Sequence, residues 1–287
     1  MDIAGTVFSF EPEKMGLRRG QDGTHCCYRK FLTRRKPHCR IAIHEGIPPD
    51  LMNGTLVQDT DSFWQVVRSG GRCLLRISPL TKRGAPRGVL ALERRLSRGE
   101  FHLGASARRA TVYGLVDLVL RHLTVTRLAG QGLLLHAAAR RGAVFVGNSG
   151  AGKTTLFRVL RRRFPSGWLS DDRVILRRAL GRWRVFGTPW HGTDRIAAQG
   201  SSPLSTLFLL RQAKANGLRK LSRLEAVAAL FRACFTPYWS EEGVAAVLRS
   251  CDELASAIPA WEFSFKNDES AADFLTSPDA DPLARLR

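Results

Sequence analysis

The chain has 287 residues, of which 44% are hydrophobic, and a formal net charge of +20 at pH 7. This length suits a globular protein of one or two domains with a large core. No run of about 18 apolar residues is present, and the polar start around Asp2 and Glu11 is unlike a signal peptide. These features argue against a membrane-spanning helix, and we expect a cytoplasmic protein with no membrane partner.

Residues 1–104 contain short apolar stretches separated by turns, at 40–43, 63–67, 73–77 and 88–92. They predict the strands of a small β-rich or α+β N-terminal domain. Its basic clusters, at 18–19, 34–36 and 94–95, could dock an acidic peptide or form a solvated surface. The basic excess of the whole chain likewise has two explanations, an anionic partner or arginine-rich codon usage, and both stay open.

The six cysteines include no Cys-x-x-Cys pair, which favours reduced thiols over a disulfide scaffold. One cluster needs weighing as a zinc site: His25, Cys26, Cys27, His38 and Cys39. In an extended segment adjacent cysteines point to opposite faces, and the spacing matches no common zinc module. Packing is therefore the preferred explanation, with a structural zinc as the alternative.

Residues 105–287 form the second predicted domain. Apolar residues at helical spacing predict a long helix over 107–127, and two strands follow at 132–139 and 143–146 around a polar turn. His136 therefore lies one strand away from the segment that follows residue 146.

That segment, Gly-Asn-Ser-Gly-Ala-Gly-Lys-Thr, matches the phosphate-binding loop between a strand and a helix. Loop amides and the helix start would bind phosphate oxygens, Lys153 would reach the β- and γ-phosphates, and the Thr154 hydroxyl would ligate Mg²⁺. The expected ATP-binding residues are Gly147, Asn148, Ser149, Gly150, Ala151, Gly152, Lys153, Thr154 and Thr155. A solvated glycine-rich turn is the simpler alternative.

An aspartate pair, Asp171–Asp172, follows the loop helix closely enough to lie on the neighbouring strand beside the phosphates. One carboxylate could accept a proton from a hydroxyl while the other holds Mg²⁺, or only one could act, as in an ATPase. A hairpin over 173–186 leads to a Pro/Gly-bounded loop with His191, Asp194 and Arg195, which could bind substrate or pack.

The remaining sequence predicts structural elements. These are a strand at 204–210, a helix from the Ser222–Glu225 capping box to about 235, a second helix through 247–258, a strand at 261–265 and a short helix at 270–275.

Taken together, several ordered motifs resemble the HPr kinase/phosphorylase-related kinases, especially the branch found in peptide natural-product clusters, including lasso-peptide kinases. The motifs are Leu134–His136, Gly147–Thr154, Leu169–Asp172 and Gly187–Gly192. The resemblance covers about residues 130–212. Thr154 stands where HPr kinase has serine, and the downstream segments that support phosphorylase activity are not found.

The resemblance implies an α/β P-loop core of the HPr kinase/phosphoenolpyruvate carboxykinase type, a homo-oligomer, and phosphorylation of serine. It implies that Asp171 is the base, that Asp172 serves the metal, and that His136 lies near the transferred phosphate, with a core histidine held by a backbone carbonyl as the alternative for His136. Our expected catalytic set also includes Lys153, from the phosphate-loop pattern, and His191, which could instead pack the loop. We therefore expect a Mg-ATP-dependent serine kinase acting on a protein or precursor peptide. The alternatives are a small-metabolite kinase or carboxykinase-like transferase, and an NTP-hydrolysing regulator or nucleic-acid-binding ATPase. No motor motif supports a nucleic-acid partner.

Overall fold

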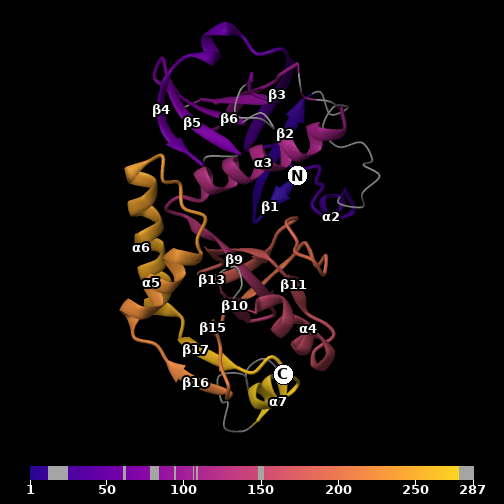
Figure 1. Ribbon diagram of the computed structural model, residues 1–287, viewed down its shortest axis with the longest axis vertical. Coiled ribbons are helices and arrows are strands. Elements are labelled where there is room, and N and C mark those ends of the chain that lie inside the picture. The colour runs from indigo at the N-terminus through magenta and orange to yellow at the C-terminus, as the bar shows by residue number, and fades with distance from the viewer. Residues whose placement is uncertain are drawn as a thin grey trace. The chain divides into compact units, whose positions relative to one another are not determined.

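The structure is a computed structural model that describes residues 1–11, 25–60, 63–77, 84–93, 95–105, 107, 109–147 and 152–277. Its contacts divide the chain into two compact units, residues 1–127 with 238–240 and residues 128–237 with 241–287. Each unit has its own β-sheet with helices, so the protein is of the mixed α/β class (Figure 1). None of the described helices is long and apolar enough to cross a membrane.

An eight-stranded sheet forms the first unit, in the order β1-β2-β3-β8-β7-β6-β5-β4. Strand β3 runs parallel to both β2 and β8, and the other neighbours run antiparallel. The strands are β1 (Asp2–Ile3), β2 (Thr6–Glu11), β3 (Cys39–Glu45), β4 (Thr55–Asp59), β5 (Trp64–Ser69), β6 (Arg72–Ile77), β7 (Gly88–Leu92) and β8 (Arg98–Leu103). The helical elements are α2 (His25–Arg29), the 3-10 turn η1 (Pro49–Met52) and α3 (Arg109–Leu128).

Helix α3 belongs to the first unit, whereas the sequence boundary at 104/105 assigned it to the second domain. Its apolar face is buried, with Val119, Leu120 and Leu123 all fully enclosed. Arg127 also donates to the carbonyl oxygen of Leu96 at 2.7 Å. An amphipathic helix joins whichever core covers its apolar stripe, and here that core is the first one.

An aromatic cluster explains why residues 238–240 also belong to the first unit. The His122 ring stacks on Trp239 with 4.4 Å between ring centroids, and Trp64 packs edge-on against both rings. Burial lowers the pKa of His122 to about 3, so the imidazole is neutral at physiological pH.

The second unit contains a nine-stranded mixed sheet in the order β14-β13-β12-β9-β10-β15-β17-β16, with β11 also paired to β9. Strands β10, β15 and β17 run parallel, and the others join antiparallel. The strands are β9 (Gly132–Arg140), β10 (Ala143–Val146), β11 (Trp168–Ser170), β12 (Arg173–Ala179), β13 (Arg182–Gly187), β14 (Ser201–Pro203), β15 (Thr206–Gln212), β16 (Gly217–Lys220) and β17 (Ala260–Phe265). The helices are α4 (Lys153–Arg163), α5 (Arg223–Ala233), α6 (Glu241–Ala257) and α7 (Ser270–Thr276).

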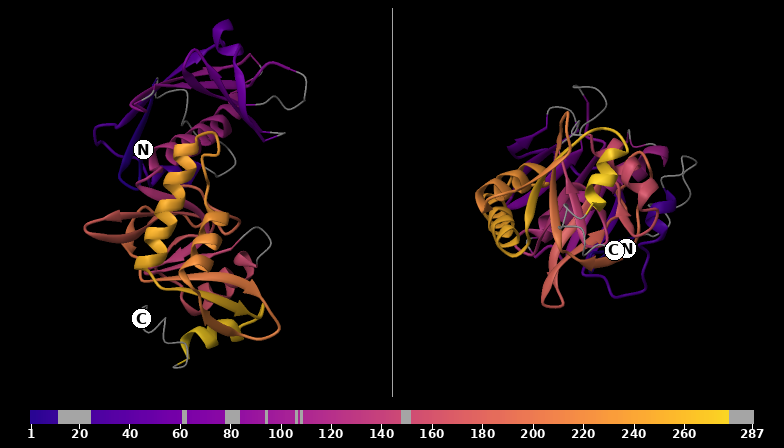
Figure 2. Two further views of the ribbon diagram at one scale, coloured as in Figure 1. Left: turned by 90° about the vertical axis from the view of Figure 1, so that its left-hand side faces the viewer. Right: turned by 90° about the horizontal axis from the view of Figure 1, so that it is seen from below.

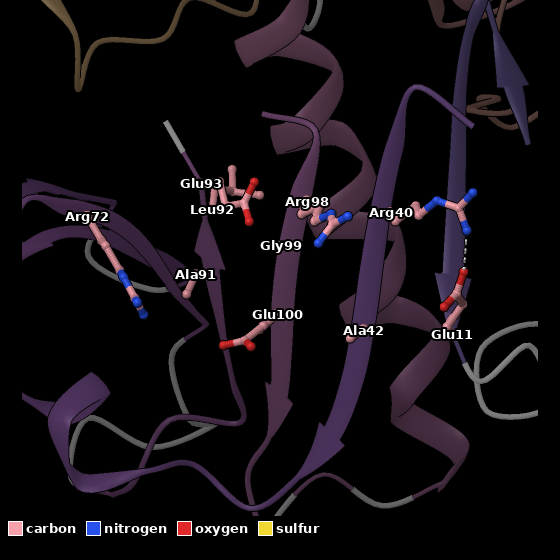
Figure 3. A pocket seen from close by; sticks show the side chains of 10 residues that line it. All are labelled: Glu11, Arg40, Ala42, Arg72, Ala91, Leu92, Glu93, Arg98, Gly99 and Glu100. Atoms are coloured by element: carbon pink, nitrogen blue, oxygen red, sulfur yellow. Dashed lines mark hydrogen bonds and ion pairs between the residues drawn. The ribbon is translucent and has the colours of Figure 1, made fainter. Parts of the chain in front are cut away.

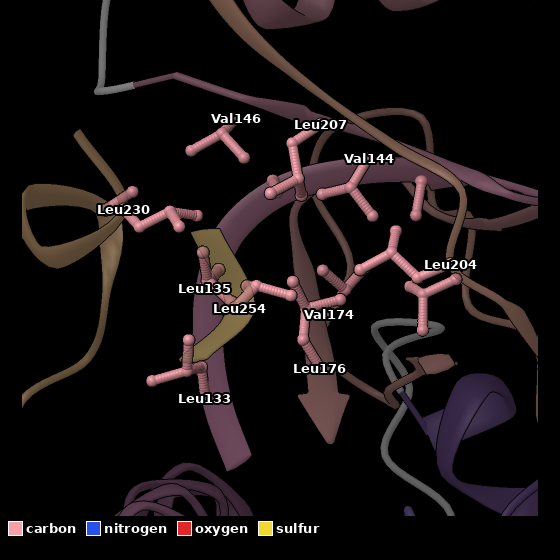
Figure 4. Packing of buried hydrophobic residues seen from close by; sticks show 14 of the residues in the cluster. Leu133, Leu135, Val144, Val146, Val174, Leu176, Leu204, Leu207, Leu230 and Leu254 are labelled. Carbon is pink, nitrogen blue, oxygen red and sulfur yellow. The ribbon is translucent and has the colours of Figure 1, made fainter. Parts of the chain in front are cut away.

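Two apolar clusters form the core of this unit. One packs α5 and α6 against the sheet through residues such as Leu135, Val144, Leu230 and Leu254 (Figure 4). The other packs α4 and α7 through Phe145, Phe157, Phe208, Phe263 and Leu275. Alternate residues of the strands enter the two clusters, so the sheet is covered by helices on both faces (Figure 2).

Candidate functional site

The site begins at Gly147, directly after the end of β10. The next four predicted phosphate-binding residues lie outside the described residues: Asn148, Ser149, Gly150 and Ala151. Gly152 has a φ of 79° and immediately precedes α4. A Cβ there would lie 2.4 Å from the Gln212 amide nitrogen and 2.9 Å from the Phe265 ring. Backbone conformation and space therefore both require glycine.

Lys153, the first residue of α4, is buried, with 9% of its surface exposed. Its Nζ donates to the carbonyl oxygen of Gly147 at 2.6 Å. Burial lowers the pKa of Lys153, and the negative charge of Asp172 partly opposes that decrease. A cationic side chain is thus held between the end of β10 and the start of α4, while Thr154 and Thr155 beside it are exposed.

Asp171 is buried in the link between β11 and β12. Its Oδ1 accepts the backbone N–H of Gly192 at 2.8 Å, and its Oδ2 accepts that of Asp194 at 2.9 Å. Burial raises the pKa of Asp171. These hydrogen bonds and the nearby His191 lower that pKa by a smaller amount, so its net shift is upward. The result is a fixed carboxylate that binds a proton more readily than an ordinary aspartate, which suits a general base.

Asp172 has a different environment although it is the next residue. Its Oδ1 lies 2.9 Å from His136 Nδ1, and its Oδ2 accepts a hydrogen bond from Arg173. Burial alone would raise the pKa of Asp172, but the His136 hydrogen bond and the charges of Arg173, His136 and Lys153 hold it below its ordinary value. Asp172 therefore stays ionised under conditions that protonate an ordinary aspartate.

Arg173 is a site residue that the sequence analysis missed, although it directly follows the aspartate pair. Besides binding Asp172, its guanidinium lies over the ring of Phe235, 5.3 Å from the ring centre. Its Nε is buried and has no hydrogen-bond partner among the described residues. Arg173 thus places a second cation beside Asp172.

The loop after β13 fixes the aspartates from the other side. A Cβ on Gly192 would lie 3.1 Å from Asp171 Oδ2 and 3.2 Å from the Asp172 Cβ, so the loop backbone packs directly on the pair. The buried Thr188 hydroxyl donates to the carbonyl oxygen of Arg173 at 2.7 Å, and Trp190 is buried as well. These contacts hold the loop around residues 187–195 against the aspartate pair.

Two predicted residues of this loop have defined surroundings. His191 is half-buried, and its Nδ1 lies 2.8 Å from the Gly192 carbonyl oxygen. Asp194 binds the exposed Arg158 of α4, whose Nε lies 3.1 Å from both carboxylate oxygens. Asp194 therefore ties the loop to α4, which was not anticipated. Arg195 is exposed and has a positive φ of 56°.

Strand β9 lies between the aspartate pair and the phosphate-loop strand, so the expectation that the pair is on the strand next to β10 is wrong. Strands β11 and β12 both pair with β9, and β9 pairs in turn with β10. The nine-residue β9 has enough length to pair with different strands along its two halves. His136, on β9 opposite Arg173, connects the two sides of the site.

Two members of the N-terminal Cys/His cluster, Cys27 and Cys39, are buried packing residues. Burial raises the pKa of Cys39 to about 11, and the exposed His38 accepts the Val7 N–H at 3.0 Å. The segment with Cys27 is helix α2 instead of the extended segment expected, and the side chains of His25 and Cys26 lie outside the description. Throughout the described ranges, no three His, Cys, Asp or Glu side chains form a metal-binding group.

The first sheet carries a hollow of about 390 Å³ on its surface (Figure 3). Small residues such as Ala42 and Ala91 lie among its charged side chains. Three arginines and three glutamates line it: Arg40, Arg72, Arg98, Glu11, Glu93 and Glu100. Its charges are therefore balanced. None of the basic clusters predicted as a docking surface lines this hollow, and residues 18, 19 and 94 of those clusters lie outside the described residues.

The sequence was compared with protein-family models and with curated proteins, and neither comparison gave a match. We therefore infer the chemistry of the site from its own residues. In the second unit these are a buried lysine at the start of a helix, a carboxylate with raised pKa, and a neighbouring carboxylate with lowered pKa.

Proposed function

We propose that this protein is an ATP-dependent kinase that transfers the γ-phosphate to a serine hydroxyl of a protein or precursor peptide, with a P-loop core of the HPr kinase type. The observation that carries the proposal is the placement of two adjacent buried carboxylates, Asp171 held by two loop N–H groups and Asp172 paired with His136 and Arg173. The opposite directions of their pKa shifts support it. Adjacent carboxylates whose pKa values are pushed apart are suited to different roles, one as proton acceptor and one as a permanent anion.

Asp171 is the proton acceptor in this proposal. The serine oxygen forms a bond to the γ-phosphorus, the bond from that phosphorus to the oxygen of the departing ADP breaks, and the serine proton goes to Asp171. Two backbone N–H groups hold the carboxylate oxygens in place, so no reorganisation of the base is needed. Lys153 and Arg173 supply positive charge for the phosphate oxygens.

The donor set around Asp172 fits an anionic nucleotide with a divalent cation. A buried ammonium group, the positive end of α4 and a buried Arg173 nitrogen without a partner among the described residues all favour bound phosphate. Asp172 and the exposed Thr154 hydroxyl are the oxygen ligands that would hold Mg²⁺. Such an ion supplies charge neutralisation at the phosphate oxygens.

The direct test uses the intact protein, ATP labelled in its γ-phosphate, and mixtures of synthetic serine or threonine peptides. We expect transfer to serine peptides, and loss of transfer in Lys153→Ala while the exposed control Arg182→Ala retains it. Transfer to free serine but to no peptide would instead identify a small-metabolite kinase. Hydrolysis of ATP without any acceptor, stimulated by DNA or RNA, would identify a nucleic-acid-dependent ATPase. Cytoplasmic location and oligomeric state remain predictions from the sequence.

A further inference from the structure

A groove of about 410 Å³ in the second unit includes Gly147, the residue to which Lys153 donates. Helix α5 forms one wall, and residues from β10, β15, β16 and β17 form the rest. The groove therefore borders the proposed phosphate site without using the Asp171–Asp172 pair.

The shape of the groove follows from small side chains on α5. Glu225, Ala228, Ala229 and Arg232 line it at positions i, i+3, i+4 and i+7, so they share one face of the helix. The two alanines leave space between the helix and the sheet. Opposite them, the partly buried Leu221 provides apolar surface at the margin of the core that contains Val146 and Leu230 (Figure 4).

Ion pairs within the groove satisfy both of its carboxylates. Arg211 Nε lies 3.0 Å from Glu262 Oε1. Arg219 bridges the two carboxylates, at 2.8 Å from Glu225 and 3.5 Å from Glu262. Both carboxylates of the groove are therefore already paired with arginines of the groove itself.

Arg232 also lines the groove but lies outside this network of ion pairs. It is exposed, and its guanidinium makes no hydrogen bond or ion pair with the residues that the structure describes. Two residues later Cys234 pairs with Leu135 of β9, and the Phe235 N–H donates to the Leu134 carbonyl oxygen at 2.9 Å. Because Phe235 also lies under Arg173, the Arg232 end of α5 is anchored at the site.

We propose that this groove binds the acceptor segment of the peptide or protein substrate, and that Arg232 selects an acidic side chain near the acceptor serine. The proposal rests on the kinase function proposed above. An apolar substrate side chain would pack on Leu221 and the α5 alanines, while its acidic neighbour pairs with Arg232. The hollow on the first sheet, with equal numbers of arginines and glutamates, offers no such excess of positive charge.

The experiment uses the full chain and a positional-scanning set of serine peptides in which one position is fixed as Glu, Gln or Lys. Peptide binding is measured by fluorescence anisotropy, and phosphate transfer is measured separately from labelled ATP. We expect the wild type to bind the Glu set about fivefold more tightly than the Gln set at one or more positions. Arg232→Glu should abolish or invert this preference, while Arg182→Glu, a matched exposed arginine in the same unit, should retain it.

Filling the groove is an independent test. Ala229→Leu should raise the KM for peptide about tenfold, or weaken peptide binding equally, with unchanged KM for ATP. The proposal is overturned if the wild type shows no acidic preference, or if Arg232→Glu keeps it with unchanged peptide affinity. Failure of the kinase function has another signature, the absence of transferred phosphate while the charge-dependent peptide binding persists.

Discussion

Replacing Gly192 by alanine should damage the site while leaving the fold intact. The new Cβ would lie 3.1 Å from Asp171 Oδ2 and 3.2 Å from the Asp172 Cβ, so the loop or the carboxylate must move by a few tenths of an ångström. That movement lengthens the 2.8 Å bond from the Gly192 N–H to Asp171. A hydrogen bond to a charged group contributes about 1.5–3 kcal/mol, so loss of about half of it should lower kcat about 3- to 10-fold.

The same variant should change the pH profile in a defined direction. The two backbone hydrogen bonds lower the pKa of Asp171 and thereby oppose the effect of burial, so weakening one of them raises that pKa further. The rate, which requires the ionised carboxylate, should therefore rise at a higher pH than in the wild type. The assay is kcat for phosphate transfer as a function of pH, with Gly217→Ala as control because its Cβ would meet no atom within 4 Å. Wild-type kcat and an unshifted profile in Gly192→Ala would refute the assigned role of this contact.

Three further predictions concern single side chains. The pKa of His122 is about 3 in the folded state against 6.5 in the unfolded state, so protonation of the unfolded state should lower the wild-type unfolding free energy by about 2 kcal/mol between pH 7 and pH 5. His122→Phe should remove this decrease. Urea unfolding at both pH values checks this, and equal losses in the variant would contradict it. Asp172→Asn should lower the unfolding free energy by about 2 kcal/mol above pH 3.8. Because the folded pKa of Asp172 lies below 3.8, this difference between variant and wild type should shrink as the pH falls through that folded pKa. A difference that does not change with pH over that range would refute the prediction. Lys153→Ala should weaken ATP binding at least tenfold by titration calorimetry, because the phosphates lose their buried cation, and unchanged affinity would remove Lys153 from the site.

Sequence reasoning was most successful where the determining signal is local. The Ser222–Glu225 capping box is present, with the Ser222 N–H donating to Glu225 at 2.9 Å and the hydroxyl accepting the Glu225 N–H at 3.3 Å. The hairpin of β12 and β13, and the order of strand β10 before helix α4, also follow the expected pattern. Turn residues and caps act within a few positions of the chain, so they can be read without knowing the fold.

The expectations that differed depend on contacts between distant segments. The insertion of β9 between β10 and β12 is set by which strands share a core, and spacing along the chain does not determine it. The same reason explains why α3 joined the first unit, and why β14 and β16 were not anticipated. Within the site, the roles of Gly192 and Arg173 depend on contacts with the aspartate pair that the sequence does not specify.

The most direct measurement of the central proposal is the initial rate of γ-phosphate transfer to a serine peptide by Asp171→Asn relative to the wild type. An amide in place of the buried carboxylate cannot accept the serine proton, and general-base catalysis contributes about 10²- to 10⁴-fold. We predict a decrease in kcat within that range, with unchanged ATP affinity and an intact fold by circular dichroism. Transfer by Asp171→Asn at the wild-type rate would contradict the assignment of Asp171 as the base.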